Sequence, residues 1–378
     1  MPSGRNDDSL NGTQWSAALR RAIAGVGGSG TGPAPAVPQD RLPEADPSPL
    51  PCSVSALERL SGGASLETWR FDLVEGGRST PLILRRTPQG SAARIRDNAC
   101  IDPPTEAALL GLAADAAVPV PRVRAVLGPG HALGDGFVMD RIDGETLGRK
   151  IARAPELAPA RQQLAYQCGV AMARIHQIAP ARLPPLRVAA APDQLAYYRG
   201  MHRRHGTAKP VFELAFQWLR EHAPAAPAQP VLVHGDFRNG NLIVDATGLR
   251  AVLDWELAHL GDGMEDLGWI CVNSWRFGRH DLPVGGFGTR AALFAGYEAA
   301  GGRVDAARVS YWQVFGTLKW GVICEGMAHA YLSGAERDLE KAAIGRRASE
   351  TEIDLLELLA PPPSTRPATR LATPAPGA

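Results

Sequence analysis

The apolar residues between positions 53 and 142 are grouped in short runs separated by turn residues. ALERL and LETWRFDLV flank the turn SGGAS, and PLILRR, VPVPRVRAVL and GFVMDRI follow along the chain. Short apolar runs bounded by Gly, Ser and Pro are typical of antiparallel strands. One further segment, PPTEAALLGLAADAA, has helical spacing and begins with prolines. These residues therefore predict a small unit of strands with one helix.

The pattern becomes helical after Gly144. Apolar residues three and four positions apart recur in QQLAYQCGVAMARIHQI, DQLAYYRGMHRRH, VFELAFQWLREHA, TRAALFAGYEAA, SYWQVFGTLKWGVICEGMAHAYL and ASETEIDLLELLA. The segment PVLVHGDFRNGNLIVDATGLRAVLDWE interrupts this series with short apolar runs around two polar turns, which predicts strands. We therefore predict an α+β fold with two lobes, a small β-rich N-lobe at residues 53–142 and a mainly helical C-lobe at residues 143–360.

The two ends of the chain differ from these lobes in composition. Residues 14–24 have the spacing of a short amphipathic helix, but the following segment is rich in Gly, Pro and Ala and has no apolar periodicity. We therefore predict a disordered leader at residues 1–50, whose removal up to residue 48 should leave thermal stability unchanged. The Pro-rich tail at residues 361–378 is also predicted to be disordered.

Composition and charge narrow the classes of partner. With 45% hydrophobic residues the chain can bury an ordinary core, which excludes a wholly disordered or fibrous protein. The 40 basic and 39 acidic residues give a formal net charge of +1, so no overall field attracts nucleic acid or an anionic membrane. The five cysteines are widely spaced without a CxxC pair, and the sequence shows neither a signal peptide nor a membrane span. These features predict a cytoplasmic protein whose partner is a small molecule; the oligomeric state stays open.

The segment HGDFRNGNLIVDATGLRAVLDWE predicts a metal site from its register alone. With a two-residue turn at residues 247–248, Asp245 lies opposite Arg250, and Asn241 lies opposite Asp254. Directly opposed residues point to the same side of a sheet, so an amide and a carboxylate would stand together at the open end of this hairpin. Two adjacent oxygen ligands suit Mg²⁺, which completes its shell with water and phosphate.

Asp236 precedes Asn241 by five residues and follows the apolar run VLV. A carboxylate at this position can accept the proton of an attacking hydroxyl close to the metal. In the alternative interpretation, Asp236 and Asn241 only stabilise the loop through bonds to its backbone, as such residues often do. The convergence of all three groups through one register favours a metal-phosphate site.

HGDFRNGN followed by VLDWE resembles the catalytic and metal loops of the aminoglycoside phosphotransferase-like family of small-molecule kinases, which have a protein-kinase-like fold. Protein kinases carry the corresponding catalytic and metal-binding residues in the motifs H-R-D-x-x-x-x-N and D-F-G. The resemblance covers residues 53–360. It implies transfer of the γ-phosphate of ATP to a hydroxyl, with Asp236 as the catalytic base or as the group that orients the hydroxyl. Asn241 and Asp254 would bind Mg²⁺, and His234 would mainly shape the loop.

Asp266 in MEDLGW resembles the acidic residue with which the family supports its catalytic loop. It follows Asp254 too closely for the long activation segment of a protein kinase to lie between them. A protein substrate is therefore disfavoured.

The resemblance also assigns weaker nucleotide-binding features to the N-lobe. The turn with Gly62 and Gly63 resembles the phosphate-covering turn, although a double glycine is also common in simple hairpins. GFVMDRIDG matches the connector between the lobes. This match implies that the backbone from Met139 to Arg141 hydrogen-bonds adenine.

Arg85 occupies the position at which many relatives have lysine, and arginine can grip phosphate while remaining charged. Strand alternation places Arg85 and Arg86 on opposite faces, so only one can point into the cleft, and we predict Arg85. Glu106 would then be its partner on the helix, as in the Lys-Glu pair of kinases. The alternatives are a solvated strand end and an exposed glutamate in the first turn of a helix.

The acceptor is the least defined part of the prediction. SWRFG and YWQVFGTLKWGVICEG resemble the branch of acyl-CoA-dehydrogenase-associated phosphotransferases, which implies a hydroxyacyl-CoA or another anionic metabolite. Several basic residues are expected near the acceptor pocket, among few acids such as Glu325: Arg276, Arg279, Arg290, Arg303 and Lys319. The tryptophans nearby are expected to pack in the core.

Three other functions remain as alternatives. In these alternatives the chain is a nucleotide-binding pseudokinase scaffold, a true aminoglycoside kinase or a metal-dependent phosphohydrolase. The last is disfavoured because the sequence lacks the additional carboxylates and histidines of a two-metal centre.

Overall fold

The structure is a computed structural model that describes residues 12–24, 52–60, 66–87, 100–128 and 131–360. Its strands are β1 (Cys52–Arg59), β2 (Glu67–Glu75), β3 (Arg78–Arg86), β4 (Val123–Leu127), β5 (Gly136–Asp140), β6 (Val231–Val233), β7 (Leu242–Asp245), β8 (Gly248–Val252) and β9 (His259–Gly261). Its α-helices are α1 (Gly12–Ala24), α2 (Pro103–Asp115), α3 (Gly148–Arg153), α4 (Ala158–His176), α5 (Ala191–His205), α6 (Pro210–Glu221), α7 (Met264–Trp269), α8 (Arg290–Ala299), α9 (Ala306–Leu332), α10 (Leu339–Gly345) and α11 (Ala348–Leu359).

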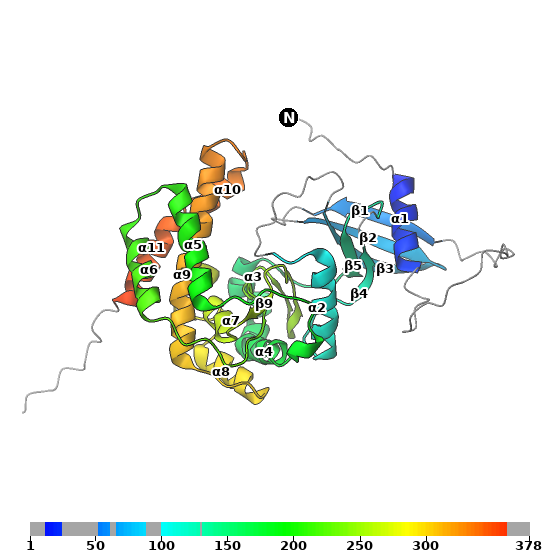
Figure 1. Ribbon diagram of the computed structural model, residues 1–378. Coiled ribbons are helices and arrows are strands. Elements are labelled where there is room, and N and C mark those ends of the chain that lie inside the picture. Colours follow the sequence, from blue (N-terminus) through cyan, green and yellow to red (C-terminus); the bar gives the residue numbers. More distant parts are fainter. Residues whose placement is uncertain (1–11, 25–51, 61–65, 88–99, 129–130, 361–378) are drawn as a thin grey trace, which may run out of the picture.

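The predicted elements are confirmed in both lobes. β1 to β5 form an antiparallel sheet in the order β1-β2-β3-β5-β4, and the helices predicted after Gly144 are α4, α5, α6, α8, α9 and α11 (Figure 1). The sequence did not predict α3, α7, α10 or β9. Among the described residues, no helix combines the length and apolar character that a membrane crossing requires.

The two faces of the N-lobe sheet follow the alternation along β3. Leu82 and Leu84 belong to the cluster beneath α1, whereas Ile83 belongs to the core that contains α2. The same alternation separates the next two residues, because Arg85 points toward α2 and Arg86 points toward α1. One strand thus supplies side chains both to the outer packing beneath α1 and to the contact with α2.

Helix α1 covers the outer face of this sheet (Figure 1). Trp15 is 3% exposed, its ring lies 4.9 Å from that of Trp69, and the Arg86 guanidinium lies 4.4 Å from its centroid. Ala18 and Leu19 are buried on the same face of the helix. The prediction of a disordered leader is therefore wrong for residues 12–24, because the sheet provides an apolar partner for their amphipathic pattern. Residues 25–51 and the tail at 361–378 lie outside the described residues.

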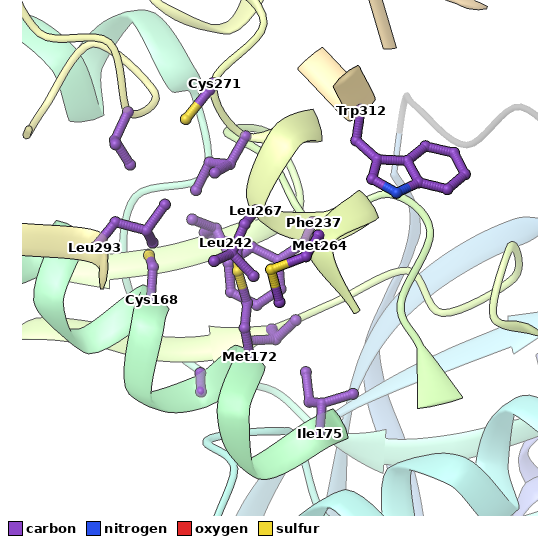
Figure 2. Packing of buried hydrophobic residues seen from close by; sticks show 14 of the residues in the cluster. Cys168, Met172, Ile175, Phe237, Leu242, Met264, Leu267, Cys271, Leu293 and Trp312 are labelled. Atoms are coloured by element: carbon purple, nitrogen blue, oxygen red, sulfur yellow. The ribbon is translucent and has the colours of Figure 1, made fainter. Parts of the chain in front are cut away.

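The core of the C-lobe lies between α4, α7 and the β7-β8 hairpin. Figure 2 shows Met172 and Ile175 of α4 near Met264 and Leu267 of α7 and Leu242 of β7. All of these side chains are buried, and the same cluster continues into α2 and the inner face of the N-lobe sheet. This shared core fixes the short helix α7 directly beneath the loop between β6 and β7.

The β7-β8 hairpin has a different register from the predicted one. Asp245 pairs with Gly248, and the backbone N–H of Leu253 donates to the carbonyl of Asn241, so Asn241 does not lie opposite Asp254. The turn moves by one residue because Asp245 Oδ1 accepts hydrogen bonds from the N–H and hydroxyl of Thr247, at 2.8 and 2.6 Å. A bulge between Ile243 and Val244 reduces this shift, but at the open end Leu242 still pairs with Val252, one residue away from the predicted pairing.

Candidate active site

Asp266 of α7 anchors the loop that follows β6. Its Oδ2 accepts the His234 backbone N–H and its Oδ1 accepts that of Gly235, both at 2.9 Å. His176 of α4 contacts Oδ2 through Nε2 at 3.0 Å. Burial alone would raise the pKa of Asp266, but the hydrogen bonds and the charges around it hold that pKa below its ordinary value. Asp266 thus lies in the supporting position that the sequence predicted.

His234 connects this loop to the end of β8. Its Nδ1 accepts the backbone N–H of Asp236 at 3.2 Å, so Nε2 carries the proton and donates to the carbonyl of Leu253 at 3.1 Å. Complete burial lowers the pKa of the imidazole, which keeps the ring neutral. The position of His234 fits the structural role expected from the sequence.

The carboxylate of Asp236 accepts three hydrogen bonds from side chains. Trp269 Nε1 and Arg238 Nε donate to Oδ1 at 2.8 and 3.0 Å, and Asn241 Nδ2 donates to Oδ2 at 2.6 Å. Asn241 Nδ2 also donates to the Asp236 carbonyl at 2.9 Å. The Asp236 side chain is 13% exposed, so it is held in one orientation and still reaches the surface of the loop.

Asn241 and Asp254 carry the oxygens that suit a divalent cation. The amide nitrogen of Asn241 is used by Asp236, which leaves its Oδ1 for a metal. Asp254 Oδ1 binds Arg85, and the Asp254 side chain is 33% exposed. Among the described residues no group of three or more His, Cys, Asp or Glu side chains is arranged to hold a metal. An amide oxygen and a carboxylate are the kind of ligands that Mg²⁺ takes, because it binds one or two protein oxygens and completes its shell with water and phosphate.

Arg85 binds two carboxylates, one from each lobe. Its Nη1 donates to Glu106 Oε1 at 2.5 Å and its Nη2 donates to Asp254 Oδ1 at 2.7 Å. Although burial opposes its charge, the two carboxylates raise the pKa of Arg85 above its ordinary value. Burial raises the pKa of Glu106 to about 7, against the attraction of the guanidinium. The predicted contact between Arg85 and Glu106 is therefore present, and Arg85 also binds Asp254.

Helix α2 places Glu106 beside Arg85. Asp102 caps the helix by accepting the Thr105 N–H at 2.8 Å, and Pro103 begins the first turn. Glu106 lies in this first turn and also accepts the backbone N–H of Trp255 at 3.2 Å. The alternative of an exposed glutamate is wrong, because the side chain is only 2% exposed.

The connector between the lobes leaves fewer donors for adenine than predicted. The N–H of Arg141 donates to the carbonyl of Pro81 at 3.1 Å, and that of Asp140 donates to the carbonyl of Arg122 at 2.9 Å. Met139 pairs with strands on both sides. The contact of Met139 and Arg141 with adenine stays a prediction, restricted to groups other than these two amides. Gly62 and Gly63 lie outside the described residues.

The basic residues expected around the acceptor do not form one surface. Lys319 is 5% exposed and donates to the carbonyl of Gly235 at 3.1 Å, Arg279 pairs with Asp281, and Arg290 binds Gln313. A cavity of about 740 Å³ between the segment 273–280, α9 and α11 contains Arg276, but its wall also holds three carboxylates: Glu350, Asp354 and Glu357. The charges of the C-lobe therefore give no support to an anionic acceptor, contrary to the expectation from the sequence.

Trp269 is the side chain at this site that the sequence interpretation missed. It was expected to pack in the core, and it is indeed 4% exposed, but its indole N–H reaches Asp236. No local motif marks this contact, because the residue lies in a short buried helix 33 positions after the carboxylate.

A two-lobed fold with a loop-borne aspartate, a following asparagine and aspartate, and an arginine held by a helix glutamate defines a kinase-like phosphotransferase. Residues 56–303 match the model of the phosphotransferase enzyme family (APH), and the chain belongs to this family. It is thus an enzyme of the small-molecule kinase class, as the sequence predicted.

The curated relatives are much longer proteins. Acyl-CoA dehydrogenase family member 10 of Mus musculus is 30% identical over 206 residues, which are 50% of this chain and 18% of that protein. The probable acyl-CoA dehydrogenase IBR3 of Arabidopsis thaliana is 24% identical over 326 residues, 79% of this chain and 38% of that protein. The chain thus spans less than two fifths of the length of either relative.

Solved structures confirm the predicted fold. A proposed aminoglycoside phosphotransferase from Ralstonia eutropha JMP134 superposes with a TM-score of 0.62 at 22% identity, covering 83% of this chain and 94% of that one. A thermostable mutant of aminoglycoside phosphotransferase APH(4)-Ia, in ternary complex with ADP and hygromycin B, gives 0.54 at 19% identity, with 82% and 95% covered. At these identities the likeness establishes the fold alone.

Proposed function

We propose that this protein transfers the γ-phosphate of ATP to a hydroxyl of a small molecule with the help of Mg²⁺. The observation that carries this proposal is a set of contacts: Asn241 donates to Asp236, the Asn241 carbonyl accepts the N–H of the residue before Asp254, and Arg85 binds both Asp254 and Glu106. Phosphoryl transfer requires mainly positioning and charge neutralisation from a protein, and these groups supply both.

In the proposed reaction the acceptor hydroxyl binds Asp236. Its oxygen attacks the γ-phosphorus, the bond from that phosphorus to the bridging oxygen breaks, and ADP leaves. The hydroxyl proton passes to the Asp236 carboxylate and then to solvent. Asn241 and Asp254 would hold Mg²⁺, which neutralises phosphate charge when it is bound.

Arg85 provides a permanent positive charge for the phosphates. Its guanidinium cannot lose its proton at physiological pH, and its contact with Glu106 sets its direction. The contact between Arg85 and Asp254 joins the two lobes, so it also connects strand β3, which would bind the nucleotide, to the position that would bind the metal. In this arrangement arginine supplies the charge that lysine supplies in protein kinases.

For the acceptor we propose a hydroxyacyl-CoA. Support comes from the relatives, whose names describe acyl-CoA dehydrogenases. A kinase that shares its ancestry with a segment of such proteins would act on a hydroxylated acyl thioester. The charges of the C-lobe do not contribute to this choice, because the basic side chains are dispersed.

The test is incubation of the purified protein with ATP, Mg²⁺ and single acceptors, followed by mass spectrometry. The acceptors are hydroxyacyl-CoAs of several chain lengths, the corresponding free hydroxy acids, and kanamycin and neomycin. We expect a mass gain of one phosphoryl group on a hydroxyacyl-CoA, lost in Asp236→Asn and kept in Asp115→Asn, an exposed carboxylate on α2.

Phosphorylated antibiotic instead of phosphorylated thioester would identify an aminoglycoside kinase and refute the proposed acceptor. Nucleotide binding without any product would identify the pseudokinase scaffold and refute phosphoryl transfer.

A further inference from the structure

The contact between Trp269 and Asp236 links the end of α7 to the catalytic loop. The indole Nε1 of Trp269 donates to Asp236 Oδ1 at 2.8 Å, and the side chain is 4% exposed. A buried indole N–H normally finds a hydrogen-bond partner, but here the partner is the carboxylate proposed to act on the acceptor. A residue that only filled the core would not need this direction.

The hydrogen bonds of Asp236 distinguish its two oxygens. A carboxylate oxygen offers two lone-pair positions, and those of Oδ1 are taken by Trp269 and Arg238. Oδ2 accepts one side-chain bond, from Asn241 at 2.6 Å, and keeps one position. The acceptor hydroxyl therefore has Oδ2 as its available partner.

We infer that Trp269 is a positioning residue that fixes the rotation of the Asp236 carboxylate so that Oδ2 faces the acceptor. This inference rests on the proposed function of Asp236. Trp269 suits the task because its indole donates one hydrogen bond and does not titrate. It holds the carboxylate from a rigid helix, whereas Arg238 belongs to the same loop as Asp236.

The surroundings of Trp269 prevent the indole from turning away. Lys319 Nζ lies 4.5 Å from the ring centroid of Trp269 and also donates to the carbonyl of Gly235. This side chain of α9 therefore contacts both the indole and the loop. The ring of Trp275 lies 5.1 Å away. A Cβ added at Gly316 would lie 2.8 Å from Cε3 of Trp269, so only glycine leaves room for the ring at this point of α9. The donor is thus preorganised before any substrate arrives.

The inference is tested by Trp269→Phe, which keeps an aromatic ring and removes the N–H. Trp320→Phe is the matched control, since Trp320 is 9% exposed in the same tryptophan cluster and its Nε1 has no hydrogen-bond partner among the described residues. We expect Trp269→Phe to lower kcat roughly 10- to 100-fold, the loss caused by misplacing a catalytic group by about 1 Å. The KM for ATP should stay within about twofold, because Trp269 acts on the acceptor side.

Equal kcat values for Trp269→Phe and the wild-type protein, or equal losses in both Phe variants, would overturn the inference. A measurement without turnover covers the case in which Trp269→Phe does not fold. The chain has eight tryptophans, and the indole N–H signals of the ¹⁵N-labelled protein can be compared with those of Asp236→Asn. We expect one strongly hydrogen-bonded signal to move, and an unchanged indole spectrum would contradict the contact. If the wild-type protein phosphorylates no acceptor, the proposed function fails, while the spectrum still tests the contact.

Discussion

Replacing Trp15 by alanine should release helix α1 from the N-lobe. The side chain is 3% exposed, its ring lies 4.9 Å from that of Trp69 at an interplanar angle of 45°, and the Arg86 guanidinium lies 4.4 Å from its centroid. A helix of 13 residues is only marginally stable in isolation, so its order depends on this contact with the sheet. The perturbation therefore measures docking of the whole helix.

The expected magnitude follows from the buried area. A tryptophan buries about 200 Å², which corresponds to about 5 kcal/mol at about 25 cal/mol per Å². This value is an upper limit, because the unfolded chain already hides part of that surface. Measured replacements of a buried tryptophan by alanine cost about 3 to 5 kcal/mol, and we expect a loss of docking free energy of about 3 kcal/mol.

The assay is amide hydrogen exchange of α1, followed by mass spectrometry. A loss of about 3 kcal/mol corresponds to an increase of about 100-fold in the exchange rate of its protected amides. Arg20→Ala, an exposed position on the same helix, is the control and should leave exchange nearly unchanged. Unaltered protection of α1 in Trp15→Ala would refute the docking, as would equal thermal stability of the intact chain and a chain lacking residues 1–24.

Three further perturbations test the site. Asp254→Asn should weaken Mg·ATP binding at least about tenfold in calorimetry, since a neutral amide is a poorer ligand for a hard cation; equal affinity would contradict the metal assignment. In Glu106 the folded-state pKa of about 7 exceeds the ordinary value of 4.5, so its contribution to stability is present at low pH and is lost as the pH rises through this window. In urea titrations the free energy of unfolding of the wild-type protein should therefore fall relative to that of Glu106→Gln between pH 5 and pH 8, and parallel profiles would show that the group does not titrate there. Asp266→Asn should lower the free energy of unfolding by about 3 kcal/mol or more, because Asn replaces a buried carboxylate that accepts two backbone N–H groups; a melting temperature equal to the wild-type value would show that the loop is held by other contacts.

The sequence correctly predicted those features of the site that depend only on neighbouring residues along the chain. Strand alternation correctly separated Arg85 from Arg86, because the period of two is a property of the strand itself. The register of the β7-β8 hairpin was wrong by one residue, because Asp245 binds the backbone of Thr247 and moves the turn. The spacing of apolar residues gives no information about that hydrogen bond between Asp245 and Thr247.

Contacts between distant segments were beyond the reach of the sequence. The pattern of residues 14–24 was recognised as amphipathic, but its partner is a sheet whose outer face exists only after folding. Trp269 and Lys319 resemble an ordinary core residue and an ordinary charged residue, respectively, until α7 and α9 bring them together beneath the catalytic loop. The resemblance to known kinases supplied the proposed reacting groups, whereas the side chains that support them were visible only in the structure.

The backbone conformation of Asp254 limits which residues can replace it. Its φ of 65° lies in the left-handed region, where glycine, asparagine and aspartate are tolerated and most other residues are strained. Of the residues that a single nucleotide change can reach from an aspartate codon, asparagine, histidine and glycine occupy that conformation most readily. Descendants that lose catalysis but retain the fold should therefore most often carry one of these three residues at position 254. Their sequences would still show this constraint on the backbone after the activity had gone.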